Sequence, residues 1–193
     1  IPEVLSNYTE KKRNELDQTL QHSLVVGFDY YHYTKTFWLH SWGNLIPYHY
    51  NDGSEIPTGL DNTSWVSTEE GAYAIYDDDF ANAEVYGNLY NWYTIDDDRG
   101  VCPEGWHVPT DDEFKELEIF LGMSELDANS QGFRGTNEGS KLAGNADLWY
   151  NPSVIINNAE FGTSGFNALP SGYRYYENGN YYGIGNYGYF WSS

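Results

Sequence analysis

The C-terminal segment of this chain limits its possible folds more than any other part. From Gly172 through Trp191, aromatic residues alternate with glycine and asparagine. Tyrosine favours the pleated surface of a β-strand, while glycine and asparagine tolerate the positive φ angles of tight turns. We therefore predict a short, hairpin-rich sheet at this end of the chain.

The aromatic residues of this segment also predict a binding surface. Alternate residues of a strand face opposite sides, so roughly half of the rings would fill the core and the others would form an outer face. A face of tyrosine and asparagine is rigid, amphipathic and rich in hydrogen-bonding groups, which suits protein or sugar ligands. The candidate ligand-binding residues are Trp149, Tyr150, Tyr173, Tyr175, Tyr181, Tyr187 and Trp191. Alternatively, most of these rings cover the sheet or fill the core of a chain in which tyrosine, at 19 residues, outnumbers leucine.

The charge of the chain restricts its partners. Asp and Glu number 29 against 9 Lys and Arg, which gives a formal net charge of −20. Phosphate backbones and anionic membrane surfaces would be repelled, so we expect no nucleic-acid partner. No apolar run reaches the roughly 18 residues that predict a membrane-spanning helix, so we expect no membrane insertion. The acidic composition suits an extracellular or cell-surface protein.

Local patterns predict several elements before the C-terminal sheet. Thr110 and Glu113 form a capping-box pattern ahead of a helix that Gly122 would end. Apolar residues at helical spacing predict a second helix over residues 81–93, although Gly87 weakens it. Strands are expected over residues 37–39, 46–50 and 71–76, with a turn over residues 51–54.

The N-terminal segment differs from the rest in its charge. Its basic residues, Lys11, Lys12, Arg13 and Lys35, precede a much more acidic sequence, so we place a boundary between residues 1–36 and 37–193. Apolar residues at mostly helical spacing predict an amphipathic helix from Ser6 to about His22. This helix would pack on the following domain or on another chain, or it would serve in oligomerisation. Because the chain starts at Ile1 without a signal pattern, we expect that it is processed or excised from a longer chain.

Several motifs resemble one bacterial family. They occupy residues 49–57, 86–93, 99–111, 165–174 and 187–193. In this order they are similar to the signature of the Fibrobacter succinogenes major paralogous domain. The resemblance covers residues 37–193 and implies an α+β, C-type-lectin-like fold, with two helices around short irregular antiparallel sheets. It also implies a secreted or surface-attached bacterial protein.

Residues 108–114 resemble the formylglycine-generating-enzyme branch of that fold. That activity needs paired reactive cysteines, whereas this chain has only Cys102, so we expect no such activity. Members of the family usually continue past the motif at residues 191–193 to a second cysteine. The resemblance therefore implies that the last strands are missing and makes Cys102 a disulfide candidate. Alternatively, Cys102 is a small buried thiol.

The sequence holds no motif for nucleophilic catalysis. Its histidines show no partnered pattern with a Ser or Cys, and His107 is expected to support packing. Acidic residues are too abundant for any pair of them to indicate glycosidase chemistry. The acidic run containing Asp77 and Asp79 offers oxygen ligands for calcium, against the alternative of a solvated acidic turn. Calcium is thus a possible ligand, and no other cofactor is expected.

Together these observations predict a noncatalytic extracellular recognition or adhesion domain. It would bind a glycan or a protein through its Tyr/Trp/Asn-rich surface. The alternative is a structural subunit or scaffold module of a bacterial surface assembly, which would self-associate.

Overall fold

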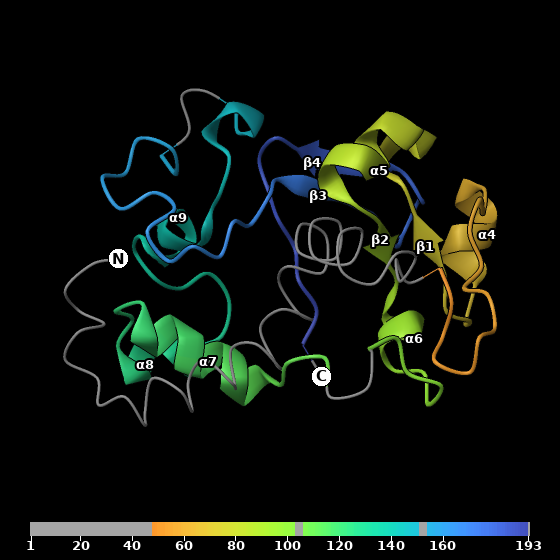
Figure 1. Ribbon diagram of the computed structural model, residues 1–193, viewed down its shortest axis with the longest axis horizontal. Helices are drawn as coiled ribbons and strands as arrows, with labels where there is room; N and C mark the ends of the chain where they lie inside the picture. The colour runs from red at the N-terminus through yellow and green to blue at the C-terminus, as the bar shows by residue number, and fades with distance from the viewer. Residues whose placement is uncertain (1–47, 103–105, 151–153, 193) are drawn as a thin grey trace.

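The computed structural model describes residues 48–102, 106–150 and 154–192 (Figure 1). The predicted N-terminal helix, the strand over residues 37–39 and the boundary at residue 36 lie outside these ranges. The described chain contains helices and two small antiparallel sheets, so the predicted α+β class is confirmed. None of its helices has the length and apolar character needed to span a bilayer.

The elements are short and follow one another closely. Their bounds are α4 Asn62–Ser67, β1 Tyr73–Ala74, η4 Tyr76–Asp78, α5 Phe80–Tyr86, β2 Leu89–Tyr90, α6 Trp92–Ile95, α7 Asp111–Phe120, α8 Glu125–Ala128, α9 Glu138–Leu142, η5 Ala146–Leu148, β3 Ser171–Arg174 and β4 Tyr181–Ile184. Strand β1 pairs with β2, and β3 pairs with β4. Figure 1 shows α7, α8 and α9 on one side of the molecule and α4, α5, α6, β1 and β2 on the other. The β3–β4 hairpin lies between these groups at one edge, and the chain after β4 runs down between them.

Helix α7 forms as predicted because its start is fixed locally. The Thr110 side chain accepts a hydrogen bond from the Glu113 backbone N–H, and the Glu113 carboxylate accepts one from the Thr110 N–H at 2.8 Å. His107 Nε2 lies 3.0 Å from Glu113 Oε1, so this histidine contacts the capping residue, in line with a supporting role. Leu117 and Leu121 then pack with Phe166 and Phe190, which joins α7 to the C-terminal part of the chain.

The single helix predicted over residues 81–93 is wrong. Helix α5 ends at Tyr86, where Gly87 adopts a φ of 78° that a residue with a side chain seldom takes. The chain then forms β2 and a new helix, α6, which Asn91 caps by accepting a hydrogen bond from the Thr94 N–H. The expected strand over residues 71–76 is also shorter, because only Tyr73–Ala74 pair and η4 follows.

The described core is built around aromatic and small residues in several clusters. One contains Tyr50, Ile56, Tyr73, Tyr90 and Val101. Another contains Trp65, Ala72 and Ala74, with Leu60 and Tyr181 packed against it. Tyrosine therefore does fill part of the core, as the alternative interpretation of the sequence expected.

Candidate functional site

The β3–β4 hairpin divides its tyrosines between two sides. Tyr173 is paired with Tyr182 across the hairpin, and Arg174 is paired with Tyr181. Because successive side chains of a strand point to opposite faces, these two pairs lie on opposite sides of the sheet. Tyr182 is 41% exposed and Tyr173 is half-buried on the same side, whereas Arg174 is buried and Tyr181 packs against the Trp65 cluster.

The outward-facing rings form one connected group, which we call the tyrosine face. It consists of Tyr173, Tyr175, Tyr176, Tyr182, Tyr187 and Tyr189. The Tyr173 ring lies at its centre, with centroid distances of 4.9 Å to Tyr189 and 5.9 Å to Tyr182. Such tilted and edge-to-face contacts each add about 0.5–1.5 kcal/mol beyond the burial of ring area. The face is therefore held together by its own ring contacts.

Much of the tyrosine face is open to solvent. The exposed fractions are 70% for Tyr176, 54% for Tyr187 and 56% for Tyr189. The Asn178 side-chain amide donates a hydrogen bond to the Tyr182 hydroxyl at 3.1 Å. Rings and hydrogen-bonding groups are thus presented together.

A glycine permits the position of Tyr187. Gly183 has a φ of 80°, and a Cβ atom there would lie 2.7 Å from the Tyr187 ring. The ring consequently packs directly on the backbone of β4. A larger residue at position 183 would push it away.

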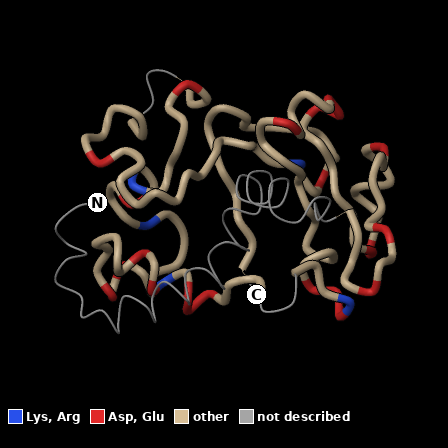
Figure 2. Tube along the Cα trace, viewed as in Figure 1, with Lys and Arg blue, Asp and Glu red and all other residues tan. Residues whose placement is uncertain are grey.

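The tyrosine face carries no charged residue of its own. Hydrogen bonding to the neighbouring Glu177 carboxylate raises the pKa of Tyr175 to about 12, and burial raises the pKa of Tyr189. These two hydroxyl groups remain protonated at neutral pH, and that of Tyr175 already donates to Glu177. Figure 2 shows acidic residues on loops throughout the molecule and few basic ones.

The inner side of the hairpin holds a buried arginine. The Arg174 guanidinium lies between two rings, 4.6 Å from the Trp65 centroid and 4.9 Å from that of Tyr181. Its Nε donates to the Gly179 carbonyl and its Nη2 to the Leu60 carbonyl, both at 2.8 Å. Arg174 thereby fixes the hairpin to the segment that precedes α4.

Two of the predicted ligand-binding residues are inward anchors instead. The Tyr181 hydroxyl donates a hydrogen bond to Asp78 at 2.7 Å, and its ring packs on the Trp65 cluster. Trp149 is only 8% exposed, and its Nε1 donates to the Gly144 carbonyl at 3.0 Å. Each uses its polar atom to hold the fold together, and a ligand-binding role for Trp149 or Tyr181 stays a prediction.

The other predicted residues are exposed or half-buried. Tyr173, Tyr175 and Tyr187 belong to the tyrosine face. Tyr150 is 64% exposed and its backbone N–H donates to the Gly185 carbonyl, next to β4. Trp191 is 43% exposed and pairs with Trp92 at a centroid distance of 5.5 Å.

The sequence prediction missed four exposed aromatic residues. Tyr176, Tyr182 and Tyr189 stand in the same aromatic run. The register of the hairpin pairs Tyr182 with Tyr173, and the exposed fractions and ring contacts place Tyr176 and Tyr189 beside them. Trp92 is separated from Trp191 by most of the C-terminal half of the chain, and no local pattern joins them.

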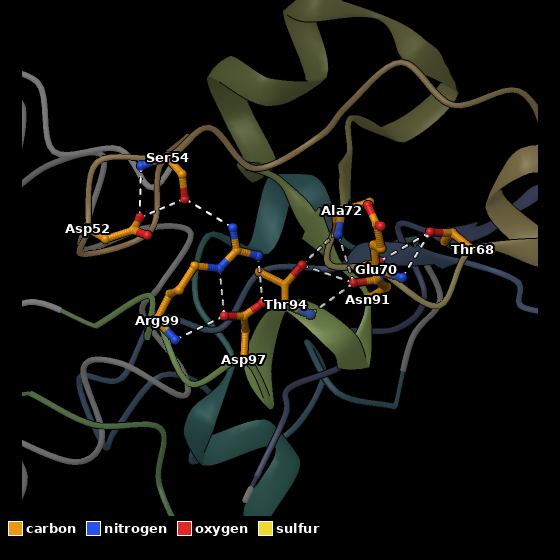
Figure 3. Close-up of polar contacts among 9 residues, drawn as sticks. All are labelled: Asp52, Ser54, Thr68, Glu70, Ala72, Asn91, Thr94, Asp97 and Arg99. Carbon is orange, nitrogen blue, oxygen red and sulfur yellow. Dashed lines mark hydrogen bonds and ion pairs between the residues drawn. The ribbon is translucent and has the colours of Figure 1, made fainter.

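A polar network lies away from the tyrosine face, around Arg99 (Figure 3). Arg99 donates to both carboxylate oxygens of Asp97, at 2.8 and 2.7 Å, and to Ser54 Oγ at 3.0 Å. Its guanidinium also lies 3.7 Å from the centroid of the Tyr50 ring. These bonds lower the pKa of the Asp97 carboxyl.

Most polar side chains of this group bond to one another or to the backbone. Ser54 Oγ donates to Asp52 at 2.6 Å, and the bond lowers the pKa of Asp52, which makes that carboxylate a weak base. Asn91 accepts from the Ala72 N–H and donates to the Glu70 carbonyl, while Thr94 donates to the Ala72 carbonyl. The bonds of Asn91 and Thr94 hold the segment before β1 to the start of α6.

The contact between Arg99 and Ser54 joins two segments that are far apart in the sequence. Both segments lie within a region that matches a known family. The family model described as the Fibrobacter succinogenes major domain matches residues 32–193. The chain belongs to this family. Comparisons with curated proteins and with solved structures gave no match.

In this family member, Cys102 follows the segment that holds Arg99. The thiol packs against the cluster around Tyr50 and Tyr90, and burial raises its pKa to about 12. A thiolate is therefore strongly disfavoured at neutral pH, and Cys102 is a poor nucleophile. It is the chain's only cysteine, so a disulfide would need a partner in another chain or segment.

The two predicted calcium ligands, Asp77 and Asp79, lie where η4 meets α5. Asp79 caps α5 by accepting a hydrogen bond from the Ala81 N–H at 2.9 Å, and Asp77 is separated from it by a residue with a φ of 55°. Within residues 48–102, 106–150 and 154–192, no group of three or more His, Cys, Asp or Glu is placed to hold a metal ion. Calcium binding at Asp77 and Asp79 stays a prediction.

Proposed function

We propose that this chain is a noncatalytic recognition or adhesion domain that acts outside the cell or on its surface. It binds a glycan or a protein through the tyrosine face. The observation that carries this proposal is the continuous contact among outward-facing tyrosine rings on one side of the hairpin.

The physical properties of the tyrosine face support recognition. A tyrosine side chain has few rotatable bonds, so ordering it on binding costs little conformational entropy. Ring contacts and Gly183 already restrict these side chains, and Arg174 anchors the hairpin beneath them. Preorganised rings that are still exposed can release water and gain contact when a ligand binds.

The polar network around Arg99 supports a role without catalysis. Its carboxylates accept hydrogen bonds from Arg99 and Ser54, and their pKa values are lowered, so they are unsuited to general base chemistry at neutral pH. The net charge of −20 also argues against a nucleic-acid partner.

Binding assays with matched variants test this proposal. The wild-type chain is applied to arrays of immobilised glycans and of bacterial surface and host extracellular proteins. The double variant Tyr176→Ala/Tyr187→Ala should lose the binding that the wild type shows, whereas Phe80→Ala should keep it. Phe80 is the matched control because its ring is 78% exposed and lies on α5, outside the tyrosine face. Binding that the double variant retains would refute the proposed role of this face.

A scaffold role is the second candidate, and exposed apolar residues favour it. Leu126 is 83% exposed and Val154 is 86% exposed, although neither belongs to the tyrosine face. Exposed apolar side chains can be buried between copies of a chain. Size-exclusion chromatography with light scattering distinguishes the candidates: a stable assembly that Leu126→Ser dissolves would favour the scaffold.

We also propose that the fold is C-type-lectin-like. The placement of α5 and α7 around small antiparallel sheets, with a C-terminal hairpin, supports this idea. An experimental structure whose helices and sheets superpose on those of a C-type lectin would establish it, and a different strand order would refute it.

A further inference from the structure

The tyrosine face continues beyond the hairpin along the last described segment. From Tyr187 to Trp191, exposed residues alternate with less exposed ones, as in an extended strand. Phe190 points inward, with its ring 6.1 Å from that of Phe166. Tyr187, Tyr189 and Trp191 therefore share the outer side of this segment.

Trp191 connects this side to α6. Its indole Nε1 donates to the Tyr90 carbonyl at 2.8 Å, which fixes the ring in place. Trp92, the first residue of α6, lies beside it, with the two rings inclined by 58°. Their exposed fractions are 43% for Trp191 and 38% for Trp92.

The result is a row of exposed or half-buried rings from the hairpin to α6, which we call the aromatic track. Ring contacts join its members Tyr176, Tyr175, Tyr173, Tyr182, Tyr189 and Tyr187, and separately Trp191 and Trp92. Trp191 follows Tyr189 by two residues on the same side of the last segment, which places the second group after the first.

We infer that the aromatic track binds a single extended chain of a neutral glycan. This inference deepens the proposed function and rests on it. Sugar rings present C–H faces that stack on aromatic rings and hydroxyl groups that bond to tyrosine and asparagine. A linear chain can engage the successive rings of the track one after another.

The width of the track favours a thin ligand over a folded protein. The hairpin has only two strands, about 5 Å apart, and the final segment adds one more. A standard protein–protein interface covers about 800 Å² on each partner and involves roughly 20–30 residues. The track has only eight rings, far fewer than the residues of such an interface.

The lack of charge on the track and the inclination of its rings indicate which kind of glycan it binds. No member of the track is charged, and the surrounding chain has a net charge of −20, so an anionic polysaccharide would be repelled. Neighbouring rings are inclined by 64° between Tyr175 and Tyr176 and by 50° between Tyr187 and Tyr189. A flat crystalline surface could not lie on all of them, whereas a soluble chain can turn along the row.

Affinity measurements on soluble polysaccharides test the inference. The probes are mixed-linkage β-glucan, xylan, glucomannan and dextran, with polygalacturonate as the anionic comparison and disaccharides as short ligands. We expect at least one neutral polymer to bind, more tightly than its disaccharide and than polygalacturonate. Tyr176→Ala and Trp92→Ala, at opposite ends of the track, should each weaken that binding about tenfold or more. Phe80→Ala should leave it unchanged, and circular dichroism melting checks that each variant is folded.

The possible outcomes separate this inference from the proposed function. Polymer binding that Tyr176→Ala abolishes but Trp92→Ala leaves intact would show that the ligand does not extend along the whole track. The proposed role of the tyrosine face would stand. Tighter binding of polygalacturonate than of every neutral polymer would refute the inference that the ligand is neutral. If no polysaccharide binds but a protein ligand is lost in Tyr176→Ala/Tyr187→Ala, the inference fails and the proposed function survives. If neither kind of ligand binds the folded wild type, both fail.

Discussion

At the scale of single residues, Arg174 has the most demanding position in the described chain. It is only 8% exposed and no carboxylate within the described ranges forms an ion pair with it, so its charge is balanced by two rings and by carbonyl groups. A planar guanidinium can stack on both rings while donating in its plane. Lysine cannot reproduce this arrangement.

Replacing Arg174 by lysine should therefore destabilise the protein. We expect Arg174→Lys to lower the free energy of unfolding by about 2–4 kcal/mol, because hydrogen bonds from a charged group and both ring contacts are lost. Urea unfolding followed by tryptophan fluorescence measures the change. Arg134→Lys is the control, since Arg134 is a partly exposed arginine that pairs with Glu118 at 2.9 Å. An equal loss in the two variants would contradict the special role of Arg174.

Cys102 gives a prediction about alkaline pH. Burial raises the pKa of its thiol from 9.0 to about 12, so the unfolded chain loses this proton before the folded chain does. The corresponding stabilisation is complete below pH 9 and is lost as the pH rises towards 12. The difference in unfolding free energy between wild type and Cys102→Ala should shrink over this range in urea titrations. A difference that stays constant would show that the thiol is not desolvated in the folded protein.

At the scale of elements, sequence patterns within a few residues predicted helix starts, whereas contacts between distant residues could not be predicted. Thr110 and Glu113 lie three residues apart, so the start of α7 could be predicted from the sequence. Gly87 is a signal against the helix over residues 81–93, but the helical spacing of apolar residues continues across it and outweighs that signal in the prediction. In the tyrosine face, the alternation of residues was predictable, but which side faces the core depends on the pairing of Tyr173 with Tyr182. That pairing follows from a turn with no fixed length in the sequence pattern, so the pattern alone does not say which side of the sheet Tyr181 faces.

The cap of α7 can be tested by a conservative pair of substitutions. Thr110→Ala removes the hydroxyl that accepts from the Glu113 N–H and should cost about 1 kcal/mol of stability. Thr110→Ser keeps the hydroxyl and should cost much less. Thermal and urea unfolding measure both. Equal effects of the two variants would mean that the methyl group of Thr110, and not the cap, is important.

The hairpin beneath the tyrosine face can be tested through its glycine. Gly183→Ala should destabilise the chain by about 1–2 kcal/mol, because alanine is strained at positive φ. It should also change the near-ultraviolet circular dichroism of the tyrosines, because the new Cβ would displace the Tyr187 ring. Gly132→Ala is the matched control, because Gly132 has a φ of 84° and a Cβ atom there would meet no described atom within 4 Å. This variant should lower the stability through backbone strain without changing the tyrosine spectrum. A spectral change in both variants would contradict the contact with Tyr187.

At the scale of the whole molecule, electrostatic repulsion opposes folding. The net charge of −20 is spread over many loops, and few basic residues offset it (Figure 2). Repulsion between like charges is greater in the compact state than in the expanded unfolded chain. Dissolved salt weakens this repulsion, since charges separated by more than the Debye length of about 10 Å at 0.1 M are largely screened.

Added sodium chloride should therefore raise the melting temperature, and the same experiment can test calcium. At matched ionic strength, calcium chloride and sodium chloride should act alike if charge screening is the sole cause. A larger rise with calcium that EDTA reverses and Asp77→Asn removes would establish the predicted site at Asp77 and Asp79. Glu69→Gln serves as the control, because it removes one negative charge from an exposed loop without touching the acidic run. A melting temperature that falls as sodium chloride is added would contradict the dominance of repulsion. It would mean that favourable ion pairs such as Lys115–Asp111 stabilise the folded state more than the excess negative charge destabilises it.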